Sequence, residues 1–234
     1  MRKKNALLIT CEHGGNTVPS EYRYLFNNKD ILTTHHGYDP GALPLAKKIA
    51  IYNHCDLQYE TICRLLVDQN RSVGHASLFS RYSQQLLQVE RELLLVRYYH
   101  PYHQKILSLL QENLSAKLLT IHLSLHTFTP VLDGVERKAD VGILYDPSRT
   151  VESNSAERLK KHLKEQIDGI RVRRNYPYKG ISDGLTAWLR KKYSYAVYCG
   201  IEIEINQKHY MEKTAIWKQL SVHLPRIIGE LHNF

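Results

Sequence analysis

Histidines and acidic residues gather at a few places where the sequence changes from apolar to polar. His13 lies in Cys-Glu-His-Gly-Gly-Asn, Asp39 in Tyr-Asp-Pro-Gly-Ala, and His126 in Ser-Leu-His-Thr-Phe. Two histidines and one carboxylate form a three-ligand zinc set with an open fourth position, as in hydrolytic zinc sites. No short His-Glu-x-x-His pair is present, so such a site depends on the fold bringing distant segments together.

Two further clusters carry charges that suit binding and proton transfer. Arg64, Asn70 and Arg71 lie at the end of an apolar run, and their side chains suit planar, bidentate recognition of a carboxylate. Glu202 and Glu204 alternate with isoleucines, so a strand would place both carboxylates on one face. Two such carboxylates repel each other unless a metal or an arginine lies opposite, so we expect a cation there.

The elements that must position these residues alternate along the chain. Strands are expected at 5–11, 58–67, 117–126, 140–145, 169–173 and 195–205, and helices at 43–52, 83–96, 99–113, 151–166, 185–193 and 210–231. This order predicts an α/β fold with a mixed, mainly parallel sheet flanked by helices. Ligands of such sheets bind beyond the carboxyl ends of strands, and polar clusters follow Ile9, Val67, Leu125 and Ile203. Since no linker or repeat interrupts the pattern, we expect one domain over 1–234.

Composition limits the class of protein. The 234 residues are 43% hydrophobic and 24% charged, which is typical of a folded globule and excludes disordered and collagen-like chains. No apolar run is long enough for a membrane span, and four scattered cysteines suggest reduced thiols and a cytoplasmic location. The net charge of +9 suits small anionic partners. It would also suit nucleic acid, but the sequence has no nucleic-acid motif and its tyrosines are dispersed.

Five stretches, in order, resemble the N-formylglutamate amidohydrolase family. They are Cys-Glu-His-Gly-Gly-Asn-x-x-Pro, Tyr-Asp-Pro-Gly-Ala, Arg-Leu-Leu-Val-Asp-x-Asn-Arg-Ser, Ser-Leu-His-Thr-Phe and Glu-Ile-Glu-Ile-Asn-Gln, and Tyr-Met-Glu follows. The resemblance extends from about residue 5 to 215. It implies a fold like that of zinc carboxypeptidases and aspartoacylase-type deacylases, and a role in histidine degradation. It also implies one catalytic Zn²⁺ per chain, although the same ligand types suit other divalent ions.

The resemblance also implies which residues would bind the metal. His13 would be the first ligand, Asp39 the carboxylate ligand and His126 the last. Glu12, beside His13, is the alternative carboxylate. In the carboxypeptidase relatives the carboxylate follows the first histidine by three residues, a position that Asn16 occupies here.

The remaining roles follow in the same way. Arg64 would polarise the scissile carbonyl, and Asn70 with Arg71 would hold a substrate carboxylate. The general base would be a glutamate of the Glu202/Glu204 pair. The spacing to the later Tyr-Met pair favours Glu204, whereas the preceding glycine favours Glu202, and we favour Glu204.

The sequence thus predicts a zinc-dependent hydrolase that uses metal-activated water and a glutamate base. Its substrate would be a small anionic N-acyl amino acid of the N-formylglutamate type, split into formate and glutamate. The acidic side chain calls for a second cation, for which Lys179 and Arg81 are candidates. The alternatives are a deacylase or carboxypeptidase-like hydrolase of another N-acyl amino acid or peptide, a non-catalytic basic binding protein, and a zinc-binding relative without activity.

Overall fold

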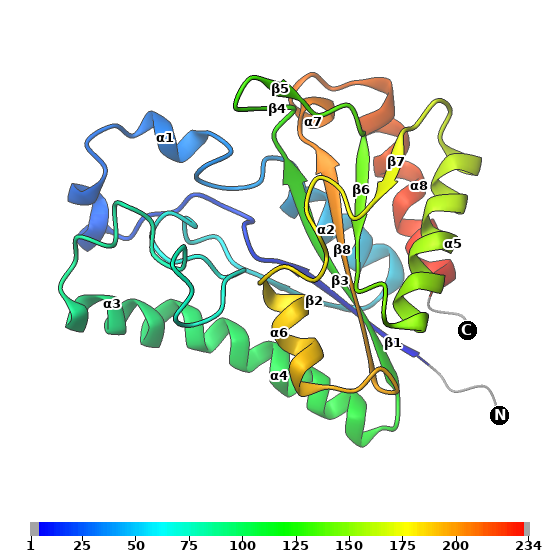
Figure 1. Cartoon of the computed structure of the whole chain (residues 1–234), viewed down its shortest axis with the longest axis horizontal. Coiled ribbons are helices and arrows are strands. Elements are labelled where there is room, and N and C mark those ends of the chain that lie inside the picture. The colour runs from blue at the N-terminus through cyan, green and yellow to red at the C-terminus, as the bar shows by residue number, and fades with distance from the viewer. Residues whose placement is uncertain (1–4, 232–234) are drawn as a thin grey trace.

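The computed structural model describes residues 5–231, which build a six-stranded sheet between helices (Figure 1). The strands are β1 (Asn5–Cys11), β2 (Asp56–Tyr59), β3 (Leu119–Phe128), β6 (Val141–Leu144), β7 (Val172–Arg174) and β8 (Tyr198–Asn206). Their order is β2-β1-β3-β8-β6-β7, and all neighbours are parallel except β6 and β8. This confirms the predicted mixed, mainly parallel sheet. A separate hairpin pairs β4 (Val131–Leu132) with β5 (Val135–Glu136).

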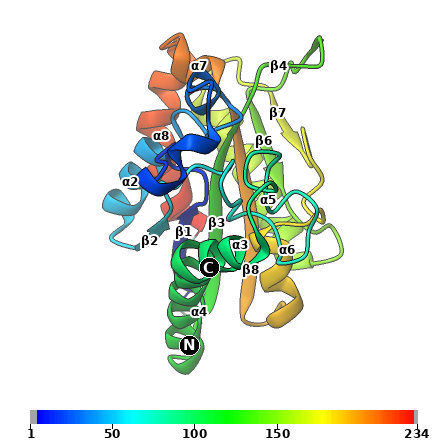
Figure 2. The same cartoon turned by 90° about the vertical axis from the view of Figure 1, so that its left-hand side faces the viewer.

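Apolar residues that alternate along the strands pack under helices on both faces of the sheet. Helices α2 (Ala42–Asn53), α5 (Thr150–Gln166) and α8 (Ala215–Leu231) cover one face, where Ile121, Leu123 and Ile203 are buried. Helices α4 (His100–Ser115) and α6 (Leu185–Lys192) pack on the other face around Leu8 and Tyr198. Figure 2 shows α2 and α8 on one side of the central strands and α6 on the other. None of the described helices has the length and apolar content needed to cross a membrane.

The chain after β2 corrects the expected strand at 58–67. Only Asp56–Tyr59 pairs with β1, and the following residues form turns without a ladder. Ile62, Leu66 and Val67 are nevertheless buried, because they pack in a second apolar cluster with residues of η1 (Ser20–Leu25). The apolar run was therefore a signal of burial and not of strand pairing. The short helix α1 (Asp30–Thr33) packs against the same apolar cluster through Ile31 and Leu32.

The helix boundaries differ from expectation at three places, and the first is a helix start at Gln88 instead of at residue 83. No break occurs at Pro101, because α3 (Gln88–Leu94) continues through the π-helical turn η2 (Leu95–Tyr99) into α4. The wider turn lies just before Pro101, whose ring and missing N–H would disturb a regular helix. The expected helix at 210–231 is instead divided into α7 (Lys208–Met211) and α8. The Thr214 hydroxyl accepts a hydrogen bond from the Trp217 N–H at 3.2 Å and so begins α8.

The central parallel strands carry the chemistry-bearing residues to one edge of the sheet. The chain leaves β1 at Glu12 and His13, and in the register of β3 and β8 His126 is opposite Glu204, with Ser124 opposite Glu202. Because these side chains alternate with the buried isoleucines and leucines, they all lie on the face away from α2 and α8. The polar residues therefore converge where the sequence pattern predicted.

Candidate active site

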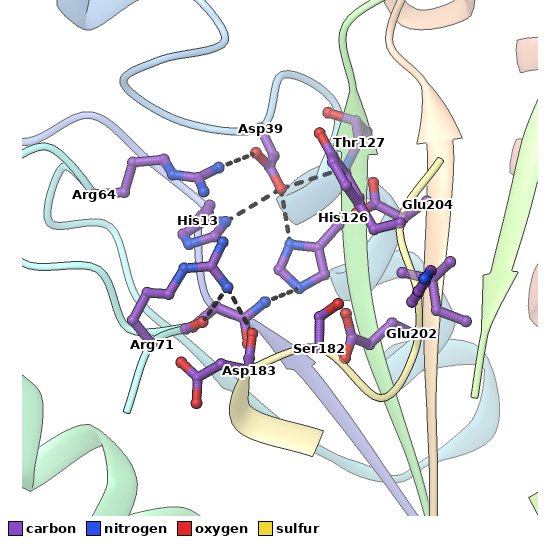
Figure 3. Close-up of a pocket in the computed structure, with 14 residues that line it drawn as sticks. His13, Asp39, Arg64, Arg71, His126, Thr127, Ser182, Asp183, Glu202 and Glu204 are labelled. Carbon is purple, nitrogen blue, oxygen red and sulfur yellow. Dashed lines mark hydrogen bonds and ion pairs between the residues drawn. The ribbon is translucent and has the colours of Figure 1, made fainter. Parts of the chain in front are cut away.

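Two histidines and one aspartate meet at the carboxyl ends of β1 and β3. His13, Asp39 and His126 are buried, and one ligand-type atom of each lies within 4.8 Å of the others. Asp39 Oδ2 lies 2.9 Å from His126 Nδ1 and 3.4 Å from His13 Nδ1 (Figure 3). His13 Nδ1 has no hydrogen-bond partner although it is buried. Asn16 is not part of this group, because its amide bonds the Leu32 carbonyl. A His/Asp/His set with an unsatisfied nitrogen fits a divalent ion such as zinc.

The Asp-Pro-Gly turn ahead of α2 places Asp39 between the two rings. The Asp39 N–H donates to the His13 carbonyl at 2.9 Å, and the Thr127 N–H donates to Asp39 Oδ2 at 3.3 Å. Gly41 completes the turn with φ of 89°, and a Cβ there would lie 2.6 Å from the ring of Tyr210. The turn therefore needs glycine both for its backbone angle and for its packing.

A carboxylate lies beside the Nε2 atom of each histidine ring. His13 Nε2 donates to Asp68 Oδ1 at 2.7 Å, and His126 Nε2 lies 2.9 Å from Glu12 Oε2. Metal-binding histidines usually donate their second ring N–H to such a carboxylate, which fixes the orientation of the ring. Glu12, the alternative ligand, thus lies behind His126, whereas Asp39 lies between the two Nδ1 atoms.

The site concentrates negative charge around the histidines. Burial alone would raise the pKa of Asp39, but the charge of His13 and the hydrogen bond to His126 hold this pKa well below its usual range. Burial likewise opposes protonation of His126, yet hydrogen bonds to Asp39 and Glu12 raise its pKa well above the ordinary value. A buried group of ionised carboxylates that attracts protons to its histidines is equally suited to attract a metal cation.

Arg64 links the two aspartates at the edge of the cavity. Its guanidinium lies 3.3 Å from Asp39 Oδ1 and 3.2 Å from Asp68 Oδ2. Burial lowers its pKa, but the charges of Asp68 and Asp39 outweigh this and raise the pKa above its ordinary value. The side chain is 26% exposed, so a fixed positive charge remains accessible to a molecule in the cavity.

The two glutamates of β8 differ in their contacts. The Glu202 carboxylate accepts a hydrogen bond from the Thr186 hydroxyl. Glu204 Oε2 is buried without a partner, and burial, helped by the charges of Asp39 and Glu202, raises the pKa of Glu204 to about 7. A carboxyl group with a free oxygen and a pKa near neutrality is suited to accept and return a proton.

These residues line a cavity of about 250 Å³, shown in Figure 3. Arg64 and Arg71 lie on one side of the His/Asp cluster, and Glu202 and Glu204 on the other. The segment between β7 and α6 completes the wall with Tyr178, Lys179, Ser182 and Asp183, and Thr127 and Leu144 also line the cavity.

Three polar residues that line the cavity differ in how far their side chains are already hydrogen-bonded within the protein. Asn70 Oδ1 accepts the Leu185 N–H at 2.6 Å, and its Nδ2 lies 3.4 Å from His126 Nε2, so its amide holds the start of α6. Arg71 donates to the carbonyl of Asp183 at 2.6 Å, while its buried Nε has no partner. Lys179 is exposed and has no acidic partner in the described part of the chain.

A sequence model of the N-formylglutamate amidohydrolase family matches residues 5–211, most of the chain. The chain belongs to this family. Membership makes it an amidohydrolase, an enzyme that hydrolyses an amide bond. No curated protein sequence matches it.

Two solved structures resemble the fold of this amidohydrolase over nearly its whole length. A gene product of Agrobacterium tumefaciens is 27% identical with a TM-score of 0.82, and the match covers 98% of this chain and 91% of that chain. An N-formylglutamate amidohydrolase from Ralstonia eutropha JMP134 is 18% identical with a TM-score of 0.69, and the match covers 98% and 92% of the two chains. At 18% identity, the likeness to the Ralstonia eutropha structure supports the fold alone.

The structure of this amidohydrolase brings nearly all of the sequence-predicted site residues to one cavity, although their roles stay predictions. They are His13, Asp39, Arg64, Asn70, Arg71, His126, Lys179, Glu202 and Glu204. Arg81 is not among the lining residues, since it is exposed with its guanidinium beside the Tyr82 ring.

Sequence reasoning missed the contacts of Asp68 with His13 and of Glu12 with His126, and it missed Ser182 and Asp183 in the wall. Asp68 and Glu12 belong to the recognised motifs, so their positions beside basic residues were a usable signal. Ser182 and Asp183 follow a Pro- and Gly-containing stretch without a motif, and only the fold places them at the site.

Proposed function

We propose that this amidohydrolase is a divalent-metal enzyme, with zinc as its metal, that cleaves the amide bond of a small N-acyl amino acid bearing a second carboxylate, as in N-formylglutamate. The observation that carries this proposal is the approach of two buried histidine Nδ1 atoms to one oxygen of Asp39, beside a glutamate with an unpartnered oxygen. The products would be the carboxylic acid, formate for an N-formyl substrate, and the free amino acid.

His13, Asp39 and His126 would hold the ion. When bound, zinc would polarise the acyl carbonyl and lower the pKa of a water molecule in the cavity. Glu204 Oε2 would accept the proton of that water and pass it to the nitrogen of the leaving amine, so the carboxyl group ends in its starting state. A pKa of about 7 suits both transfers at neutral pH.

Arg64 would stabilise the negative charge that develops on the carbonyl oxygen. Its guanidinium is already held by Asp39 and Asp68, so the charge needs no reorganisation during the reaction. Fixed donors of this kind contribute roughly 3–4 kcal/mol to transition-state stabilisation in other enzymes.

The charges at the entrance favour a substrate with two carboxylates. Lys179 has no acidic partner among the described residues, and the hydrogen bonds of Arg71 go to backbone carbonyls. Two cations without carboxylate partners would match the α-carboxylate and the side-chain carboxylate of an acyl-glutamate. Because the Asn70 amide is engaged with Leu185, we assign the α-carboxylate to Arg71 and give Asn70 the task of holding α6.

The size of the cavity favours a small substrate over a peptide. Its volume of about 250 Å³ is below the roughly 300–1,000 Å³ that is typical of sites for drug-sized molecules. We also infer from the family a cytoplasmic enzyme of histidine degradation.

The test is release of carboxylic acid from a panel of substrates by protein purified without a metal-affinity tag. The panel contains N-formylglutamate, N-formylglutamine, N-formylalanine and N-acetylglutamate. Each is assayed before chelator treatment, after it, and after zinc is restored. Glu204→Gln is the test variant, and Glu157→Gln, at an exposed carboxylate of α5 that pairs with Arg174, is the matched control.

We expect zinc-dependent formate release, fastest with N-formylglutamate, lost in Glu204→Gln and retained in Glu157→Gln. Faster cleavage of N-acetylglutamate would make the protein a deacylase instead. No hydrolysis of any compound by the zinc-loaded protein would refute the proposal.

A further inference from the structure

Glu12 is fully buried behind His126 and accepts hydrogen bonds from several directions. Its Oε2 lies 2.6 Å from the Ser124 hydroxyl and 2.9 Å from His126 Nε2, and its Oε1 accepts the Tyr102 hydroxyl at 3.1 Å. The Thr10 hydroxyl also bonds this carboxylate. A carboxylate removed from water is stable only when its oxygens are satisfied in this way, and here every neighbour can donate.

The chemistry of the donors fixes the position of the hydrogen on His126. An ionised carboxylate only accepts, so the Ser124 hydrogen points to Glu12 and the Ser124 oxygen is left to accept from His126 Nε2 at 2.8 Å. Both close neighbours of this nitrogen are therefore acceptors. Asn70 Nδ2, at 3.4 Å, is farther away than either. Nε2 must then carry a hydrogen. Nδ1, 2.9 Å from the carboxylate of Asp39, is consequently the one ring nitrogen whose lone pair a metal ion could use.

The same reasoning extends the directed hydrogen bonds into the sheet. Since Thr10 donates to Glu12, its oxygen accepts from His122 Nε2 at 2.8 Å, and His122 Nδ1 accepts from the Tyr198 hydroxyl at 2.7 Å. Each group in the series Tyr198, His122, Thr10 and Glu12 thus donates a hydrogen bond to the next, and the series ends at the Glu12 carboxylate. His122 is neutral in this arrangement, and burial does lower the pKa of His122 to about 4.

A second buried carboxylate–histidine pair, Asp140 and His209, differs from Glu12 and His126 in what the other ring nitrogen contacts. Asp140 accepts from His209 Nε2 at 3.0 Å, but the other nitrogen of His209 bonds the Thr214 hydroxyl at 2.9 Å. Both nitrogens of His209 are thus satisfied within the protein. The second nitrogen of His126 contacts Asp39 Oδ2 at 2.9 Å, and Asp39 is itself a member of the group that could hold a metal ion.

We propose that Glu12 is a positioning residue that keeps His126 in the Nε2–H form and so presents its Nδ1 to a divalent ion. This inference rests on the metal site of the proposed function. Glu12 acts through the ring of His126 and need not touch substrate. Loss of a carboxylate in this position is expected to weaken metal binding by roughly 10–100-fold.

The experiment measures the zinc dissociation constant by competition with a chromophoric chelator, for the wild type, Glu12→Gln and Ser124→Ala. Asp140→Asn is the matched control, because it removes a buried carboxylate from His209, which does not line the cavity. Urea unfolding of each variant shows how far its stability has changed. A ¹⁵N–¹H spectrum of histidine side chains reports which nitrogen of His126 carries the hydrogen.

We expect Glu12→Gln to weaken zinc binding by about 10–100-fold and Ser124→Ala to weaken it less, with the Nε2–H signal of His126 altered in both. Asp140→Asn should lower stability and leave zinc affinity unchanged. Tight zinc binding by the wild type and, within about threefold, by folded Glu12→Gln would overturn the inference and leave the proposed function standing.

Absence of zinc binding in the wild type would overturn the proposed function and this inference with it. If Glu12→Gln does not fold, Ser124→Ala and the wild-type spectrum provide the test. Unchanged zinc affinity in Ser124→Ala, or a hydrogen on Nδ1 of His126 alone in the wild type, would refute the positioning role of Glu12.

Discussion

Replacing Glu204 by glutamine is expected to stabilise the metal-free protein while it abolishes activity. Burial raises the pKa of this carboxyl from an ordinary 4.5 to about 7, so the fold favours its protonated form. The unfolded chain releases this proton at lower pH than the folded protein does. The free energy of unfolding therefore falls as the pH rises from 4.5 to 7 and stays low above 7.

The two pKa values set the size of the effect. Their difference corresponds to about 3 kcal/mol, at 1.36 kcal/mol for each pKa unit. Glutamine cannot ionise, so metal-free Glu204→Gln should be up to about 3 kcal/mol more stable than the wild type at pH 8 and nearly equal to it at pH 4.5. For a protein of this size the gain corresponds to a melting temperature higher by roughly 6–12 °C. The same substitution should lower kcat by about 10²–10⁴-fold, because the proton acceptor is lost.

The assay is urea unfolding of chelator-treated wild type and Glu204→Gln at pH 5 and pH 8, with kcat measured on the zinc-loaded proteins. Glu157→Gln is the matched control, since it removes an exposed carboxylate that pairs with Arg174 and does not line the cavity. A stability difference that is equal at both pH values, or absent at pH 8, would refute the reasoning about the pKa. Full activity in Glu204→Gln would refute its role as the base.

Three other outcomes follow from the structure. Lys179→Met should raise KM for N-formylglutamate about fivefold and leave KM for N-formylglutamine nearly unchanged, because an exposed charge contributes about 1 kcal/mol to binding. Steady-state kinetics with both substrates checks this, and equal changes in the two KM values would contradict it. The wild type should lose stability as the pH falls from about 6.5 to about 4, because burial lowers the pKa of both His103 and His122 to about 4 while the unfolded chain takes up these protons near 6.5. Urea unfolding across this pH range should show a smaller loss in His122→Gln, and an identical loss would exclude His122 as a source. Asp68→Asn should weaken zinc binding by roughly tenfold, because it replaces the charged acceptor of the His13 Nε2–H by a neutral amide oxygen. Chelator competition measures this, and unchanged affinity would contradict a role of Asp68 at the site.

The sequence was most informative where a residue pattern has one physical solution. The alternation in β3 and β8 places the leucines and isoleucines on the face covered by α2, α5 and α8, so Ser124, His126, Glu202 and Glu204 share the opposite face. The family motifs then brought the loop residues Asp39 and Arg64 into the same argument.

Where the fold differed from expectation, a long-range contact decided the outcome. The run at 58–67 looked like a strand because it is apolar, but Ile62 and Leu66 are buried by the lobe that contains Tyr22 and Phe26. Periodicity cannot distinguish burial in a loop from burial in a sheet. The break expected near Pro101 failed because a π turn accommodates the proline.

The two possible carboxylate ligands show the same limit at the site. Glu12 and Asp39 are equivalent by residue type, and spacing could not separate them. Their difference arises because the β1–β3 pairing places Glu12 behind His126, whereas the turn ahead of α2 places Asp39 between the rings. Such a distinction depends on residues more than 80 positions apart in the chain.

The proposed function depends above all on a catalytic metal ion held by His13, Asp39 and His126. The most direct measurement is zinc content by mass spectrometry on protein purified without a metal-affinity tag and dialysed after addition of zinc, beside His126→Ala prepared in the same way. We expect about one zinc per chain in the wild type and almost none in His126→Ala. A wild type without zinc, or a His126→Ala variant that retains the same zinc content, would contradict it.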